Sequence, residues 1–204
     1  DLAGLIAAAG LGRFAVLGSS VGGQLAMQLA AAWPDRITGI ILGDIGPDLA
    51  ATGLARLRAN VGRGGNWPTW VHAARDFSAR NAAIYPDWQF GQWLAFAKRL
   101  CRLAPSGRIV FDHDPRIAEP FRLPHADGGA DPWAALDSMA GKPVLVLRGA
   151  RSDVLTPATL AAMQARLPGM ALAEIPGVGH PPTLDEPAAM TAMDDFLKRI
   201  KAEI

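Results

Sequence analysis

The sequence predicts an α/β fold in which helices flank a parallel sheet. Apolar runs at 37–45 and 143–149 have the composition of strands buried on both faces of such a sheet. Helical patterns at 24–33, 157–167 and 186–204 alternate with the strand patterns. This alternation indicates a parallel sheet, because crossover helices connect parallel strands.

The remaining elements follow from local patterns along the chain. Residues 2–9 have apolar positions at helical spacing, and Gly10 ends that helix. Residues 14–18 form a short apolar run that predicts a strand before the helix at 24–33, which Pro34 ends. A last strand is expected at 170–176.

Composition limits the class of protein. Half of the 204 residues are hydrophobic and the formal net charge is +1, so one substantial core is expected and a nucleic-acid partner is not. The single cysteine, Cys101, excludes an intrachain disulfide and a CxxC metal clip. No apolar run approaches the roughly 18 residues that span a bilayer. We therefore expect a cytoplasmic protein with no membrane partner and no metal.

The chain divides into three parts by pattern. Residues 1–50 and 143–204 carry the strand and helix alternation of the core, whereas 51–142 consists of helical fragments broken by Gly, Pro and Asn. We expect 51–142 to be a helical cap inserted into the core. Residues 51–110 hold nine Lys or Arg and two Asp, which indicates either solvated helix faces or a surface that attracts an anionic substrate.

A candidate nucleophile lies between the first strand and its helix. The segment Gly18-Ser19-Ser20-Val21-Gly22 has the pattern G-x-S-x-G, which places its central serine on a sharp strand-to-helix turn. Glycines on both sides would let strand and helix approach closely. We expect Ser20 to be the nucleophile and the Val21 N–H, at the helix N-terminus, to be an oxyanion-hole donor. The alternative is a glycine-rich turn with a serine cap.

A serine nucleophile requires a histidine base, and four histidines are available. His72 lies in a predicted helix, His113 in an Asp-His-Asp run, and His125 in a loop rich in Pro and Gly. Only His180 follows the carboxyl end of a predicted strand, where the catalytic groups of open parallel sheets gather. His180 is therefore the predicted base, and a solvent-exposed loop histidine is the alternative.

Two aspartates compete to orient that histidine. Asp153 follows the strand at 143–149, and Asp44 lies within the run at 37–45, after the segment ITGIIL and Gly43. One helix and one strand fill the 27 positions from Asp153 to His180, which indicates that the two residues end neighbouring strands. Asp153 is thus preferred as the acid, with Asp44 as the alternative.

These residues, in the order Ser, Asp, His, resemble the α/β-hydrolase superfamily over nearly the whole chain. LGSSVGGQLAMQLAAAWPDRITGIILGDIGP resembles the family's nucleophile elbow, the strand-to-helix turn that carries the nucleophile, with the helix and strand that follow. VLVLRGARSDVLTP resembles its acid segment, and EIPGVGHPPTLDEP resembles its histidine loop. The resemblance implies Ser20, Asp153 and His180 as nucleophile, acid and base, with 51–142 as the family's helical cap and no cofactor. Serine at the elbow separates the chain from relatives that have aspartate there.

The resemblance also indicates which part of the fold the sequence contains. Relatives have several strands before the elbow, and the loop after their third strand supplies a second oxyanion-hole amide. This sequence opens at the helix before the nucleophile strand, so we expect the N-terminal part of the sheet to be absent and the second donor to be unassigned. An exposed sheet edge would favour self-association.

The function expected from these observations is hydrolysis of an ester or similar acyl bond of a small organic substrate through an acyl-enzyme on Ser20. Lactone opening and C–C bond hydrolysis use the same residues and stay open. The alternative from another class is a truncated, catalytically inactive fragment that acts as a binding or interaction scaffold.

Overall fold

Four parallel strands form the central sheet in the computed structural model, which describes residues 2–62, 64–119 and 131–202. Their order across the sheet is β1-β2-β6-β7, and every neighbouring pair is parallel. The predicted α/β class is confirmed. The strands are β1 (Phe14–Ser19), β2 (Ile37–Gly43), β6 (Val144–Gly149) and β7 (Ala171–Ile175).

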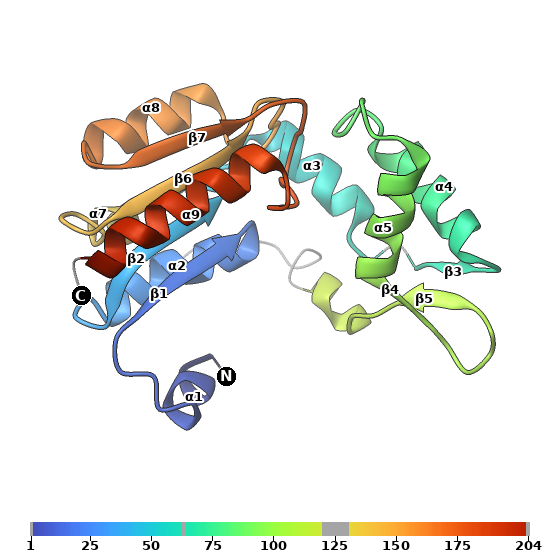
Figure 1. Ribbon diagram of the computed structural model, residues 1–204, viewed down its shortest axis with the longest axis horizontal. Coiled ribbons are helices and arrows are strands. Elements are labelled where there is room, and N and C mark those ends of the chain that lie inside the picture. Colours follow the sequence, from blue (N-terminus) through green and yellow to red (C-terminus); the bar gives the residue numbers. More distant parts are fainter. Residues whose placement is uncertain (1, 63, 120–130, 203–204) are drawn as a thin grey trace.

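Helices cover both faces of this sheet (Figure 1). Helix α9 lies on one face, and α2, α7 and α8 pack on the other. Among the described residues, no helix is long and apolar enough to cross a membrane. The helices of this part are α1 (Leu2–Ala8), α2 (Val21–Ala32), α7 (Pro132–Asp137), α8 (Pro157–Arg166) and α9 (Pro187–Ala202).

The position of β2 inside the sheet explains why its sequence is apolar at almost every position. Ile40 and Leu42 face a core cluster formed with α2, α7 and α8. Ile41, between them, faces a second cluster that contains Phe196 and Ile200 of α9. Because successive side chains of a strand point to opposite faces, a central strand covered on both sides favours apolar side chains, and Thr38 is the one polar side chain of β2.

Residues 51–118, which lie between β2 and β6, form a separate layer, called here the insert. Figure 1 shows it beside the end of the sheet at which the strand arrows finish. Besides helices it contains a three-stranded antiparallel sheet of order β3-β5-β4. Its elements are α3 (Ala51–Asn60), β3 (Asn66–Trp67), α4 (Trp70–Asn81), α5 (Phe90–Leu100), β4 (Cys101–Leu103), β5 (Ile109–Phe111) and the 3₁₀ helix η1 (Pro115–Ala118).

The expectation of a purely helical insert therefore missed one small sheet. Its strands are two or three residues long, too short for an alternating pattern to be recognised in the sequence. The turn between β4 and β5 contains Gly107 at φ 75°, a conformation that favours glycine. His125 lies outside the described residues.

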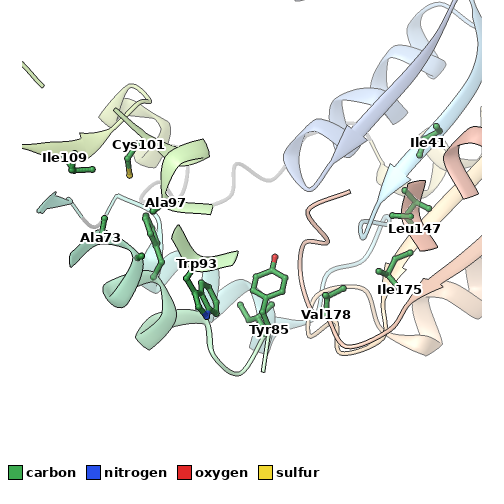
Figure 2. Close-up of a cluster of buried hydrophobic side chains, with 14 of the residues drawn as sticks. Ile41, Ala73, Tyr85, Trp93, Ala97, Cys101, Ile109, Leu147, Ile175 and Val178 are labelled. Atoms are coloured by element: carbon green, nitrogen blue, oxygen red, sulfur yellow. The ribbon is translucent and has the colours of Figure 1, made fainter. Parts of the chain in front are cut away.

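The insert and the sheet share one hydrophobic cluster (Figure 2). Trp93 and Tyr85 of the insert lie in the same cluster as Leu147 and Ile175 of the sheet. The Tyr85 ring stacks on Trp88, with ring centroids 4.0 Å apart and planes 12° apart. Shared apolar burial of this kind seats the insert against the core, because separating the two would expose aromatic surface to water.

Candidate active site

Ser20 occupies a strained turn between β1 and α2. Its backbone adopts φ 53° and ψ −123°, which is rare for a residue other than glycine. A side chain at Gly18 would place a Cβ atom 2.1 Å from the Gly22 carbonyl oxygen, so only glycine fits there. Gly22 itself faces open space, and the second close approach is at Gly23, where a Cβ would lie 2.2 Å from the Ile45 side chain. Of the two glycines predicted to allow the close approach, Gly18 is therefore required and Gly22 is not, and Gly23 is the glycine required after Ser20.

His180 faces this serine from the loop after β7. Its Nε2 atom lies 3.1 Å from Ser20 Oγ, within hydrogen-bond distance. The residue is only 1% exposed although it belongs to a loop. The structure therefore brings Ser20 and His180 together, as their positions at strand ends predict, and the alternative of a solvent-exposed loop histidine does not apply.

Asp44 is the carboxylate beside that histidine. Asp44 Oδ2 lies 2.9 Å from His180 Nδ1, and both side chains are fully buried. The other oxygen, Oδ1, accepts a hydrogen bond of 3.1 Å from the Gly149 N–H at the end of β6. Asp44 also has a positive φ of 53°, which asparagine and aspartate tolerate better than most residues. A row of hydroxyl, imidazole and carboxylate results, with the imidazole in the middle.

Asp153, the aspartate preferred from the sequence, does not hold this position. Its carboxylate forms a bidentate ion pair with Arg56 of α3, in which Nε donates to Oδ2 at 2.6 Å and Nη2 donates to Oδ1 at 2.7 Å. The hydrogen bonds from Arg56 hold the pKa of Asp153 below its ordinary value. The loop after β6 directs Asp153 toward the insert, where a Cβ on Gly53 would lie 2.4 Å from the Asp153 carbonyl oxygen.

The two other histidines in the described residues, and the acidic residues near them, have structural partners. His72 lies in α4 and contacts the Thr69 cap. His113 packs against Phe111, and its neighbours Asp112 and Asp114 pair with Arg102 and Arg116. Among the described residues, no three His, Cys, Asp or Glu side chains are grouped to hold a metal ion. The Asp-His-Asp run is thus a polar turn.

A cavity of about 690 Å³ opens at Ser20 and extends under the insert. Hydrophobic side chains of the insert supply much of its wall, among them Leu54, Leu57, Phe96 and Phe111. Arg58 and Arg80 are basic residues of the same wall. Its lining in the described residues includes no tryptophan, and Trp67 and Trp93 are buried in the core of the insert. The insert tryptophans therefore pack the insert, and other side chains form the pocket.

The arrangement fits nucleophilic attack by a serine. A hydroxyl hydrogen-bonded to an imidazole whose other nitrogen faces a buried carboxylate is the geometry that activates serine. The Val21 N–H is the first amide of α2, and the first amides of a helix have no acceptor within it. Arg56 is the residue of this region that sequence reasoning missed.

Comparison with known proteins shows the family to which the chain belongs. The sequence model of the alpha/beta hydrolase family matches residues 1–193. A 3-hydroxybutyrate-oligomer hydrolase from Cupriavidus necator is 30% identical over 96% of this chain and 69% of its own. The crystal structure of an alpha/beta hydrolase from Novosphingobium aromaticivorans shares 47% identity and a TM-score of 0.90, over 98% of this chain and 70% of that one. The chain therefore belongs to the alpha/beta hydrolase family.

The name of a further relative gives a substrate different from that of the hydroxybutyrate-oligomer hydrolase. A 2-(acetamidomethylene)succinate hydrolase from Mesorhizobium japonicum is 25% identical over 88% of this chain and 62% of its own. The chain thus spans 62% of this relative and 69% of the hydroxybutyrate-oligomer hydrolase. The shared family establishes a hydrolase fold, and the two names give different substrates.

The Arg56–Asp153 pair predicts how stability depends on pH. Because the folded-state pKa of Asp153 lies below the ordinary value of about 3.9, folding favours the ionised carboxylate. That stabilisation is complete above pH 4 and is lost as the pH falls through the lowered pKa. Asp153→Asn should lower the melting temperature at pH 7, and the difference from wild type should shrink below pH 4.

Thermal unfolding followed by circular dichroism at several pH values measures this effect. Asp137→Asn is the matched control, because it breaks the exposed pair with Arg166, for which little stabilisation is expected. Equal melting temperatures of wild type and Asp153→Asn at pH 7 would contradict the prediction.

Proposed function

We propose that this chain is a serine hydrolase that cleaves an ester or similar acyl bond of a small organic substrate. The observation that carries the proposal is the row of Ser20, His180 and Asp44, with 3.1 Å between Ser20 Oγ and His180 Nε2 and 2.9 Å between His180 Nδ1 and Asp44 Oδ2. Membership of the alpha/beta hydrolase family supports the same reaction class.

In the proposed reaction Ser20 Oγ attacks the acyl carbon while His180 Nε2 takes its proton. Asp44 accepts the hydrogen bond from Nδ1–H and stabilises the charged imidazole that forms. The Val21 N–H donates to the oxyanion, and a second donor is unassigned. His180 then gives its proton to the leaving alcohol, and water releases the acyl group from Ser20 by the same steps.

The insert is proposed to act as the cap of this active site. The boundaries proposed from the sequence, 51–142, divide the core into 1–50 and 143–204. Within them, residues 51–118 supply most of the cavity lining, whereas α7 packs on the sheet. A mostly apolar cavity of about 690 Å³ suits a substrate of small to medium size with a hydrocarbon portion. Lactones and C–C bonds next to carbonyl groups are reaction subtypes that fit the same chemistry.

The scaffold alternative differs from the enzyme in one measurable property, the reactivity of Ser20. Ser20→Ala should lower the hydrolysis of p-nitrophenyl butyrate by 10⁴-fold or more, because it removes the nucleophile. A fluorophosphonate probe should label wild type at Ser20, which mass spectrometry of peptides identifies. Ser19→Ala is the control and should keep most activity. Labelling at Ser19, or none in the folded wild-type protein, would overturn the proposal.

The assignment of the acid gives a second comparison. Asp44→Asn should lower kcat on the order of 10⁴-fold, because an amide favours the wrong tautomer of His180. Asp153→Asn should keep kcat within about tenfold at a temperature at which the protein is folded, since this carboxylate pairs with Arg56. Steady-state kinetics of both variants, with folding checked by circular dichroism, provide the measurement. Loss of activity in Asp153→Asn alone would restore Asp153 as the acid.

An anionic substrate is proposed from the charges that border the cavity. Arg58 and Arg80 belong to its lining, and Arg80 also forms an ion pair with Asp76. Arg99 and Arg102, which pair with Asp185 and Asp112, do not belong to the lining. The named substrates of both curated relatives are also acids, a hydroxybutyrate oligomer and a substituted succinate. An acyl ester with a distal carboxylate combines the apolar and basic features of the wall.

This proposal predicts a preference between two esters that differ in one charge. The p-nitrophenyl monoester of glutarate should have a higher kcat/KM than its methylated analogue, and added NaCl should reduce the difference because salt screens the attraction. Arg58→Gln should also reduce it. Arg102→Gln is the matched control outside the cavity lining. Equal kcat/KM for the two esters at low ionic strength would contradict an anionic substrate.

Self-association through a sheet edge stays a prediction. In the part of the chain that the structure describes, β1 pairs with β2 and with no other strand, and Leu17 on β1 is 49% exposed. An apolar strand with one free edge is the kind of surface that pairs with a second chain.

A further inference from the structure

The loop that carries His180 is held by the insert on both sides of the histidine. The Gly179 N–H donates a hydrogen bond of 2.9 Å to the Ile84 carbonyl oxygen. The Tyr85 hydroxyl donates a hydrogen bond to the Pro181 carbonyl oxygen. Ile84 and Tyr85 are consecutive residues between α4 and α5, so one short segment of the insert holds both neighbours of His180.

The core holds the same loop from the opposite side. The Arg151 N–H donates 2.9 Å to the Val178 carbonyl oxygen. A Cβ on Gly149 would lie 2.5 Å from the Gly179 carbonyl oxygen, and a Cβ on Gly179 would lie 2.8 Å from Ile84 Cγ2. These distances leave no space for an additional carbon atom, so the loop is packed between the end of β6 and Ile84.

Tyr85 is a rigid donor for this purpose. The residue is 3% exposed, stacks on Trp88 and meets Trp93 edge to face. Figure 2 shows its ring at the boundary between the insert and the sheet, in the same cluster as Trp93 and Val178. Burial raises the pKa of Tyr85 well above its ordinary value. The phenol therefore stays protonated and can donate a hydrogen bond to the Pro181 carbonyl oxygen.

We propose that Tyr85 is a positioning residue for His180, which holds the imidazole between Asp44 and Ser20 and couples the seating of the insert to the reactivity of the serine. The proposal rests on the function proposed above. Without the phenol, the Pro181 carbonyl oxygen loses a hydrogen bond in a partly buried site, and the histidine loop gains freedom to shift. A displacement of about 1 Å at a reacting group can cost 10²-fold in rate.

Tyr85→Phe tests the proposal, because it removes the hydroxyl and keeps the ring that packs on Trp88. We expect kcat for p-nitrophenyl butyrate to fall about tenfold to 10²-fold with KM changed less than about twofold. The low-field proton NMR signal of His180 Nδ1–H, identified by its loss in Asp44→Asn, should move upfield as its bond to Asp44 weakens.

Two further variants separate positioning from general destabilisation. Ser138→Ala removes another hydroxyl that donates to a main-chain carbonyl, that of Ala135, and should alter neither kcat nor the His180 signal. Gly179→Ala forces Ile84 and the histidine loop apart and should change kcat and the signal in the same direction as Tyr85→Phe.

Unchanged kcat and an unchanged His180 signal in folded Tyr85→Phe would overturn the positioning role, even if the melting temperature fell. A wild-type protein that neither hydrolyses esters nor reacts with the fluorophosphonate would instead overturn the proposed function. The NMR comparison still decides the positioning role in that case, because it requires no turnover.

Discussion

The contact between Asp44 and His180 joins all four strands of the sheet at one point. Asp44 follows β2, its second oxygen takes the Gly149 N–H at the end of β6, and His180 follows β7. Ser20 follows β1 and completes the group. A buried carboxylate is costly unless hydrogen bonds satisfy it, so β2, β6 and the loop after β7 must keep their relative positions. The order of strands in the sheet and the chemistry at its edge are therefore one constraint.

The sequence predicted the parts of this arrangement that have local signals. Ser20 was found because strand, glycine turn and helix follow one another, and His180 because it alone among the histidines follows a strand that the sequence predicts. Asp44 and Asp153 both follow apolar strands, so neither local pattern nor spacing separates them. They differ in their partners, because Asp153 pairs with Arg56 and Asp44 pairs with His180. Arg56 belongs to the insert and is 97 positions from Asp153 in the chain. Interactions of that range have no periodicity to read.

Contacts between insert and core are concentrated on the loops that carry the site. Arg56 of α3 binds Asp153 after β6, and its Nη2 atom lies 3.5 Å from the His180 carbonyl oxygen. Tyr85 and Ile84 form hydrogen bonds with Pro181 and Gly179, in the loop that carries His180. The aromatic cluster around Trp93 then extends this seating into the sheet. The insert is thus part of the framework of the site as well as a wall of its cavity.

Two residues at the centre of the site, Ser20 and Asp44, share a left-handed backbone with φ 53°. A non-glycine residue in such a sparsely populated conformation costs on the order of 1–3 kcal/mol, which the surrounding packing must offset. Glycine would relieve that strain at either position, and at position 20 it would delete the proposed nucleophile. At position 44 it would also remove the hydrogen bonds with Gly149 and His180, so selection for thermal stability alone would act against Ser20 more than against Asp44.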